Sequence, residues 1–167
     1  MKKILIGLAM LFGAEGAAQA CSCLPLTGDP AQMRQLADEI AQGAVAVVDV
    51  DVRAAYNPRT RRGELMRVRE TLAGRAPREF RIARSSPPSS AACGVEYRAG
   101  SNALVVLYPA ERRMVRGQPQ FRGESLCVSM FLHNAQFRQM LIEAMRRPRV
   151  SGQTSASPAG PPCANNA

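Results

Sequence analysis

Histidine is nearly missing from this chain, since His133 is the only one among 167 residues. A histidine base needs a nucleophile and an orienting group, and nothing in the sequence marks either of them. The sequence also lacks a glycine-rich phosphate loop, a heptad pattern and an internal repeat. These absences predict that the protein is not an enzyme and uses no cofactor, and that His133 is an ordinary surface or capping residue.

Lysine is confined to Lys2 and Lys3, so every later basic residue is arginine, and the formal net charge is +9. Such a surface favours anionic partners such as lipopolysaccharide, acidic glycans, nucleic acid or acidic protein faces. Alternatively, the arginines only coat a solvated surface. No basic stripe is interleaved with stacking aromatic residues, so nucleic acid is not an expected partner. Three adjacent arginine pairs stand out: Arg61-Arg62, Arg112-Arg113 and Arg146-Arg147.

Long apolar runs are scarce, and no segment after residue 20 is long and apolar enough to cross a membrane. Residues 1–20 contain two lysines, an apolar stretch from Ile4 to Ala14 and small residues before Cys21. This pattern is typical of a cleaved bacterial-type signal peptide. The apolar stretch is shorter than the roughly 20 residues that a membrane span needs. We therefore expect an exported protein, periplasmic or extracellular, that begins at Cys21 and has no transmembrane segment.

A second interpretation of the same leader makes Cys21 a lipoprotein acylation site, because a cysteine directly follows small residues. Ala18 and Gln19 fit this less well than a leucine-rich box would. Acylation would occupy both the amino group and the sulfur of Cys21, so it would leave neither available for a disulfide or a metal contact.

Five cysteines remain after the leader, which is an odd number for an oxidising compartment. Cys163 lies in residues 150–167, a Ser-, Pro- and Gly-rich tail that we expect to be disordered and separate from a single domain at 21–149. We predict that Cys163 is unpaired and that the other four cysteines pair among themselves. The spacing Cys-x-Cys does not fit a zinc knuckle, so we expect no structural metal site. These four are Cys21, Cys23, Cys93 and Cys127.

The pattern of apolar residues predicts about five strands with a helix near each end. Asp29-Pro30 and Gly43 bound a helix at 30–42, and Asn134 begins a second helix that ends near Pro148. In the strand at 44–53, valines at 48, 50 and 52 share one face and aspartates at 49 and 51 the other. Single glutamates at 64, 70, 79, 96, 111 and 124 are expected on solvated faces. The remaining predicted strands are 64–72, with Leu65, Met66, Val68 and Leu72 as its apolar residues, 79–84 with Phe80 and Ile82 inward, 102–108, and 121–128 ending at Cys127.

The expected mature N-terminus reads Cys21-Ser22-Cys23-Leu24-Pro25, and its two cysteines need partners far along the chain. This pattern resembles the tissue inhibitors of metalloproteinases (TIMPs) and the wider netrin-like (NTR) module, whose chains open with Cys-Thr/Ser-Cys-x-Pro. The resemblance covers roughly residues 21–147. It extends to strand Val45 to Val52, to Val68-Arg69-Glu70-Thr71-Leu72-Ala73-Gly74, to Ala92-Cys93-Gly94-Val95-Glu96-Tyr97 and to Ser125-Leu126-Cys127-Val128-Ser129-Met130-Phe131.

The resemblance implies a mainly β chain that forms a five-stranded OB-type barrel, with disulfides Cys21–Cys93 and Cys23–Cys127. In the family, the first residue binds the zinc of a metalloprotease in trans through its α-amino and carbonyl groups, and the second residue enters the specificity pocket. A free α-amino group has a pKa near 8, so it is partly unprotonated at neutral pH. A catalytic zinc keeps one open coordination position for such a ligand. On this chain Cys21 would bind the zinc and Ser22 would enter the pocket, with further contacts from Cys23, Leu24, Pro25, Ala91 and Ala92.

A different function fits the same pattern. Two disulfides from a terminal Cys-x-Cys would also close the barrel of a netrin-like module that has no protease partner. Such a module would bind an envelope protein or a polyanion through its arginines and would inhibit nothing.

Overall fold

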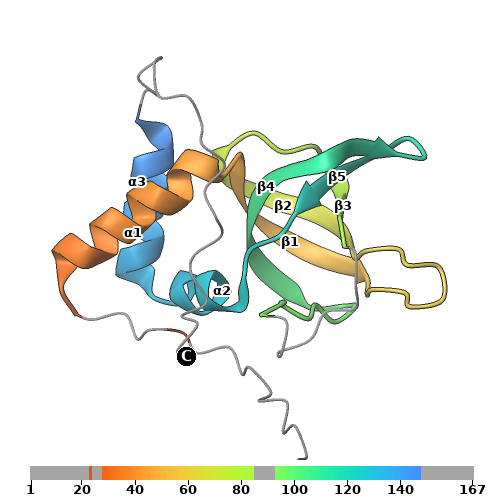
Figure 1. Ribbon diagram of the computed structural model, residues 1–167, viewed down its shortest axis with the longest axis horizontal. Helices are drawn as coiled ribbons and strands as arrows, with labels where there is room; N and C mark the ends of the chain where they lie inside the picture. The colour runs from red at the N-terminus through yellow and green to blue at the C-terminus, as the bar shows by residue number, and fades with distance from the viewer. Residues whose placement is uncertain (1–22, 24–27, 85–92, 148–167) are drawn as a thin grey trace, which may run out of the picture.

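The computed structural model describes residue 23, residues 28–84 and residues 93–147. Its five strands form one sheet that closes on itself in the order β1-β2-β3-β5-β4, with helices gathered at one end (Figure 1). The described part of the chain is mainly β, with five strands and helices on both sides of them in sequence, as the apolar pattern predicts. The elements are α1 (Pro30–Gly43), β1 (Ala46–Ala54), β2 (Leu65–Gly74), β3 (Glu79–Ile82), β4 (Asn102–Val115), β5 (Gln118–Arg122), α2 (Leu126–Leu132) and α3 (Ala135–Arg146).

Strand β1 closes the sheet because it pairs with β2 on one side and with β4 on the other, both antiparallel. The β2–β3 and β4–β5 pairs are antiparallel as well. Strands β3 and β5 run parallel, with Arg81 opposite Gln120 and Ile82 opposite Phe121. Closure leaves no unpaired edge along β1, which protects it from pairing with another chain.

Strand β1 is rich in valine because both of its faces are covered. Val48, Val50 and Val52 point into the closed sheet and are essentially unexposed. Val47 points the other way and packs under the helices. Asp49 lies on the outer, partly exposed face, so the predicted alternation is confirmed. The first residues of β1 are buried on both faces, so the sequence begins as a continuous apolar run. Later residues are buried on one face only, so apolar and polar residues alternate there.

Two helices begin at the predicted capping residues. The Asp29 carboxylate accepts a 2.9 Å hydrogen bond from the Ala31 N–H at the start of α1. The Asn134 side chain accepts a 3.0 Å bond from the Phe137 N–H at the start of α3. These bonds satisfy N–H groups that have no partner inside the helix. Both predicted helices are therefore confirmed.

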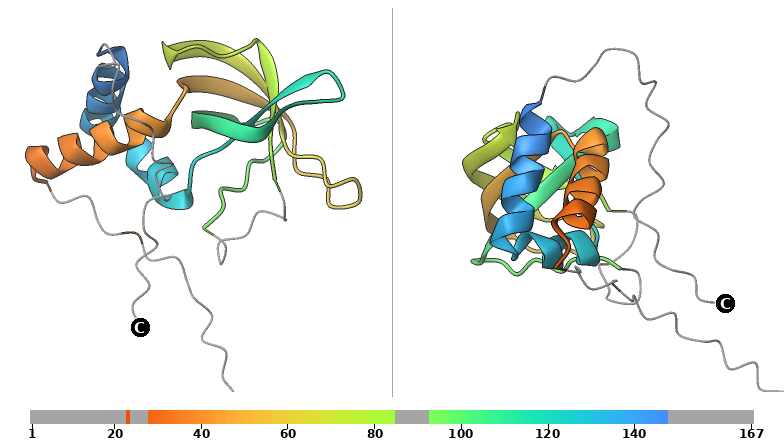
Figure 2. Two further views of the ribbon diagram at one scale, coloured as in Figure 1. Left: turned by 45° about the horizontal axis from the view of Figure 1, so that its top comes forward. Right: turned by 90° about the vertical axis from the view of Figure 1, so that its left-hand side faces the viewer.

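Helices α1 and α3 lie side by side at one end of the sheet, and α2 lies beside them (Figure 2). They enclose a second apolar core, separate from the one inside the sheet. The β1–β2 loop and the β4–β5 hairpin project from the opposite end (Figures 1 and 2). The helix-side core contains Met33, Ala37, Phe137 and Leu141, packed on Val47, Ala73 and Val106 of the sheet.

The sequence prediction is wrong between residues 109 and 132. Strand β4 continues to Val115 instead of ending at Tyr108, because it forms a hairpin with β5. Strand β5 ends at Arg122, and Cys127 lies in helix α2 rather than at the end of a strand. Ser125 caps α2 because its hydroxyl accepts a hydrogen bond from the Val128 N–H. The sequence prediction assigned this segment to a strand and so missed the cap.

None of the helices in the described parts of the chain is long and apolar enough to span a membrane.

Candidate functional site

Cys23 is joined to Cys127, the second residue of α2, and the two Cα atoms lie 5.3 Å apart. This is the pairing that the resemblance implied. The bridge links positions 104 residues apart in sequence. In the chain-entropy treatment a loop of that length corresponds to about 4–5 kcal/mol of stabilisation as an upper value. The segment before α1 is thereby tied to the helical end of the molecule.

Cys93 lies directly beside the start of α2. Its carbonyl oxygen accepts a 2.9 Å hydrogen bond from the Leu126 N–H, and Gly94 forms an isolated antiparallel bridge with Ser125. Cys93 is itself disulfide-bonded. Its sulfur and that of Cys127 therefore mark two neighbouring attachment points, one on the loop before β4 and one on α2.

The remaining residues of the predicted inhibitory site lie outside the described residues: Cys21, Ser22, Leu24, Pro25, Ala91 and Ala92. The predicted Cys21–Cys93 bridge, the signal peptide, the tail and Cys163 also involve residues outside that part of the chain. His133 is exposed, as predicted for a surface residue, and its backbone N–H bonds the Met130 carbonyl at the C-terminal end of α2.

A groove of about 1300 Å³ lies between elements that project from the end of the sheet opposite the helices; their positions are shown in Figure 1. It is formed by the β1–β2 loop, by β3 with the two residues that follow it, and by the β4–β5 hairpin. We call it the arginine groove, because the described residues that line it include seven arginines and one acidic residue, Glu111. The arginines are Arg61, Arg62, Arg81, Arg84, Arg112, Arg116 and Arg122.

Two of these arginines are held in place by hydrogen bonds. Arg81 donates from Nε to Oε1 of Gln118 at 2.6 Å and from Nη1 to the Gly63 carbonyl at 2.8 Å. Arg122 donates from Nε to the Pro109 carbonyl at 3.0 Å. The acceptors are an amide and two carbonyls, so neither guanidinium group has a carboxylate partner in these bonds.

The three arginine pairs of the sequence have different surroundings. Arg61 and Arg62 both line the groove, and of the second pair only Arg112 does. The third pair lies at the other end of the molecule. There Arg146 donates to the Leu72 carbonyl, and Arg147 forms a 3.1 Å ion pair with Asp38 of α1. Adjacency in sequence thus does not identify a common surface.

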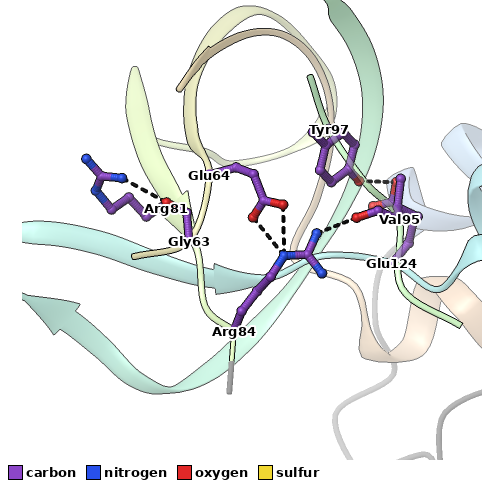
Figure 3. Close-up of polar contacts among 7 residues, drawn as sticks. All are labelled: Gly63, Glu64, Arg81, Arg84, Val95, Tyr97 and Glu124. Carbon is purple, nitrogen blue, oxygen red and sulfur yellow. Dashed lines mark hydrogen bonds and ion pairs between the residues drawn. The ribbon is translucent and has the colours of Figure 1, made fainter. Parts of the chain in front are cut away.

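A buried ion pair lies beside the arginine groove. The Arg84 Nε donates to both carboxylate oxygens of Glu64, at 2.9 and 2.7 Å, and its Nη2 donates to the Val95 carbonyl (Figure 3). The Glu64 side chain is fully buried and that of Arg84 is 13% exposed. Because a buried carboxylate needs a partner, this geometry holds Arg84 against the sheet.

A second buried carboxylate lies close by. The Tyr97 hydroxyl donates a 2.6 Å hydrogen bond to Oε1 of Glu124, and the Val106 N–H donates a 3.0 Å bond to Oε2 (Figure 3). Burial raises the pKa of Glu124 to about 7, although these two hydrogen bonds oppose the shift. Burial, followed by the charge of Glu124, raises the pKa of Tyr97 well above its usual value.

The expectation that the glutamates at 64 and 124 lie on solvated faces is therefore wrong. The strand period contained a signal for the first of them, because Glu64 shares a face with Met66 and Val68 at a spacing of two residues. Met66 is fully buried inside the sheet and Val68 packs against the same core, whereas Leu65 is only half-buried. Glu124 follows the end of β5, where no period applies, so no pattern in the sequence indicated its burial.

In the described part of the chain, no three histidine, cysteine, aspartate or glutamate side chains are grouped so as to hold a metal ion. Comparison with protein-family models, with curated proteins and with solved structures gives no match to this chain.

Proposed function

We propose that the protein is an exported inhibitor of a zinc metalloprotease, of the TIMP/netrin-like type, that acts through a mature N-terminus at Cys21. The observation that carries this proposal is the proximity of the backbone at Cys93 and at the start of α2. The Cys93 carbonyl accepts a bond from the Leu126 N–H, next to the residue that holds Cys23. A Cys-x-Cys segment spans about 7 Å between its Cα atoms, so one such segment reaches two neighbouring points.

The topology supports the same assignment. The strand order β1-β2-β3-β5-β4 with a parallel β3–β5 pair fits a five-stranded OB-type barrel. The two disulfides would hold the N-terminal residues against this rigid frame. A segment that is ordered before binding loses little conformational entropy when it enters a protease cleft.

The proposed chemistry uses the α-amino nitrogen and the carbonyl oxygen of Cys21. Together they form a five-membered chelate on the partner's zinc and displace the water that the protease uses as its nucleophile. Ser22 then enters the specificity pocket, and Cys23, Leu24 and Pro25 lie along the cleft. Because the nitrogen must be unprotonated, the inhibition constant is expected to improve as the pH rises toward 8.

The test is inhibition of a panel of zinc metalloproteases by protein whose first residue is Cys21. The matched control is the same protein with one alanine added before Cys21, which keeps the disulfides and removes the chelating amine. The proposal predicts inhibition by the first protein and none by the second. Equal inhibition by both, or none by either at micromolar concentration, contradicts it.

The second candidate is a netrin-like envelope-binding module without inhibitory activity, which the arginine groove favours. It predicts that neither N-terminal form inhibits a protease while both forms bind an anionic partner equally well. Intact mass separates both candidates from a lipoprotein, because acylation of Cys21 would add fatty acyl groups to the mature chain.

A further inference from the structure

The β1–β2 loop and the β4–β5 hairpin that line the arginine groove project from the end of the sheet opposite the helices, whereas Cys127 lies in α2 (Figures 1 and 2). Of the groove arginines, Arg84 reaches toward the Cys93 loop, where it bonds the Val95 carbonyl. Nothing in the inhibitor mechanism uses the groove. Arg84 is already paired with Glu64, but among the described residues the other six arginines share the hollow with one glutamate, so they repel one another and attract an anion.

The groove combines arginines that are held by hydrogen bonds with arginines on its rims. The half-buried Arg81 and the exposed Arg122 are preorganised by their bonds to Gln118, Gly63 and Pro109, so they lose little side-chain entropy on binding. Four further exposed arginines stand on the rims, two on the β1–β2 loop and two on the β4–β5 hairpin. Those on the rims are Arg61, Arg62, Arg112 and Arg116.

A tight turn between β4 and β5 places Arg116 at the tip of the hairpin. Arg116 and Gly117 both have positive φ, 51° and 76°, as a two-residue hairpin turn of type I′ requires. The turn presents Arg116 at the tip opposite the β1–β2 loop. Two rims that carry the same charge across an open hollow suit a ligand that lies between them.

The volume of the groove favours a polymeric ligand over a small anion. About 1300 Å³ exceeds the 300–1,000 Å³ that is usual for pockets enclosing small molecules. The arginines come from three separate elements, so no single phosphate or sulfate contacts them all. A ligand with several acidic groups spaced along its length matches this distribution.

The uncharged residues that line the groove favour one kind of polymeric anion over another. Proteins that bind single-stranded nucleic acid stack its bases on aromatic side chains. None of the described residues that line the groove is aromatic. Instead the exposed Thr60 offers a hydroxyl, and Gln118, whose amide oxygen accepts the bond from Arg81, offers an amide; such groups suit the hydroxyls of a sugar.

We propose that the arginine groove binds a linear acidic polysaccharide, whose carboxylate or sulfate groups pair with the arginines and whose hydroxyls bond the glutamine and threonine side chains. This site is independent of the N-terminal chelate, so the protein would bind an acidic glycan and a protease at the same time.

The test measures binding of the full mature chain to heparin as a sulfated polysaccharide and to polygalacturonate as a carboxylated one. The groove variant is R61Q/R112Q/R116Q. The matched control is R34Q/R75Q/R98Q, which removes the same number of exposed arginines from outside the groove. All six positions are exposed, so both variants should melt within a few degrees of the wild type.

The groove variant should bind at least one of the two polysaccharides about tenfold or more weakly at physiological salt, and the control within about twofold of wild type. The slope of log K against log salt should fall by about two to three in the groove variant only, since each lost contact releases fewer counterions. Equal losses in both variants would mean a diffuse arginine coat and overturn the proposal. Binding of neither polysaccharide by the wild type would overturn it as well.

Two further probes address other polyanions. Tighter binding of single-stranded oligothymidylate than of either polysaccharide would assign the groove to nucleic acid. Tighter binding of phosphatidylglycerol vesicles would assign it to a lipid surface, for which the exposed Met114 and Val115 on the hairpin would be the contact. Either result overturns the proposal. Protease inhibition should be unchanged in the groove variant, so failure of one proposal is distinguishable from failure of the other.

Discussion

Tyr97 and Glu124 form a buried hydrogen-bonded pair whose hydroxyl and carboxylate oxygens lie 2.6 Å apart. Burial of Glu124 raises its pKa to about 7 from the usual 4.5. The carboxyl group therefore holds a proton in the folded state over a pH range in which the unfolded chain has already released it.

The raised pKa of Glu124 determines whether the free energy of unfolding rises or falls with pH. A raised carboxyl pKa stabilises the fold fully below about pH 4.5, and the contribution is lost as the pH rises to about 7. The shift corresponds to about 3 kcal/mol. We expect the E124Q variant, which stays uncharged, to lose less stability over this range than the wild type. Denaturant unfolding of both proteins at intervals between pH 4.5 and 8 measures the difference, and parallel profiles would refute the assignment.

The Glu64–Arg84 pair predicts a large coupling. R84M leaves the Glu64 carboxylate buried without its partner, so we expect a loss of about 3–5 kcal/mol in the free energy of unfolding. The double variant E64L/R84M removes both charges and should be more stable than the sum of the two single changes implies. A double-mutant cycle with E64L, R84M and the double variant measures this. Strict additivity would show that the ion pair carries no interaction energy.

Gly63 is predicted to be intolerant of any side chain. A Cβ atom at this position would lie 1.6 Å from the Ile82 carbonyl oxygen, which is backbone and has no rotamer to change. G63A should therefore separate β2 from β3 and lower the free energy of unfolding by more than about 3 kcal/mol, in the range of severe backbone clashes. G28A is the matched control, because a Cβ there meets nothing within 4 Å. Similar thermal midpoints for the two variants would contradict the close approach.

The Cys23–Cys127 bridge should make a measurable contribution to stability. The C23S/C127A variant is expected to lose about 2–5 kcal/mol, as is usual when a native disulfide is removed. C163S is the control, since Cys163 is predicted to be unpaired, and it should leave the unfolding curve unchanged. Thiol titration of the native protein should find one free thiol that C163S removes. A destabilised C163S variant would show that the tail takes part in a bridge.

Local signals in the sequence were sufficient for several elements. Asp29 and Asn134 cap α1 and α3 because their short side chains reach the N–H groups of the first turn. The alternating valines of β1 face the core because side chains in a strand alternate. The same alternation placed Glu64 inward, and only the general preference of glutamate for water made it look solvated.

Other features depend on partners far away in the chain. The position of Cys127 in a helix depends on the packing of α2 beside α3, because the seven residues of α2 are too few to show a helical period. The burial of Glu124 is possible because Tyr97 and Val106, brought from other segments, donate hydrogen bonds to it. No window of sequence around Glu124 contains those donors.

The sequence by itself determined the number of strands, the two capped helices and an excess of positive charge, because capping and alternation act between near neighbours and charge is a sum over residues. Only the tertiary structure decided where that charge is concentrated. Closure of the sheet brings the β1–β2 loop, β3 and the β4–β5 hairpin to one end, and so gathers seven arginines from positions 61 to 122 around one groove. Their proximity follows from strand pairing between distant segments, which no local pattern encodes.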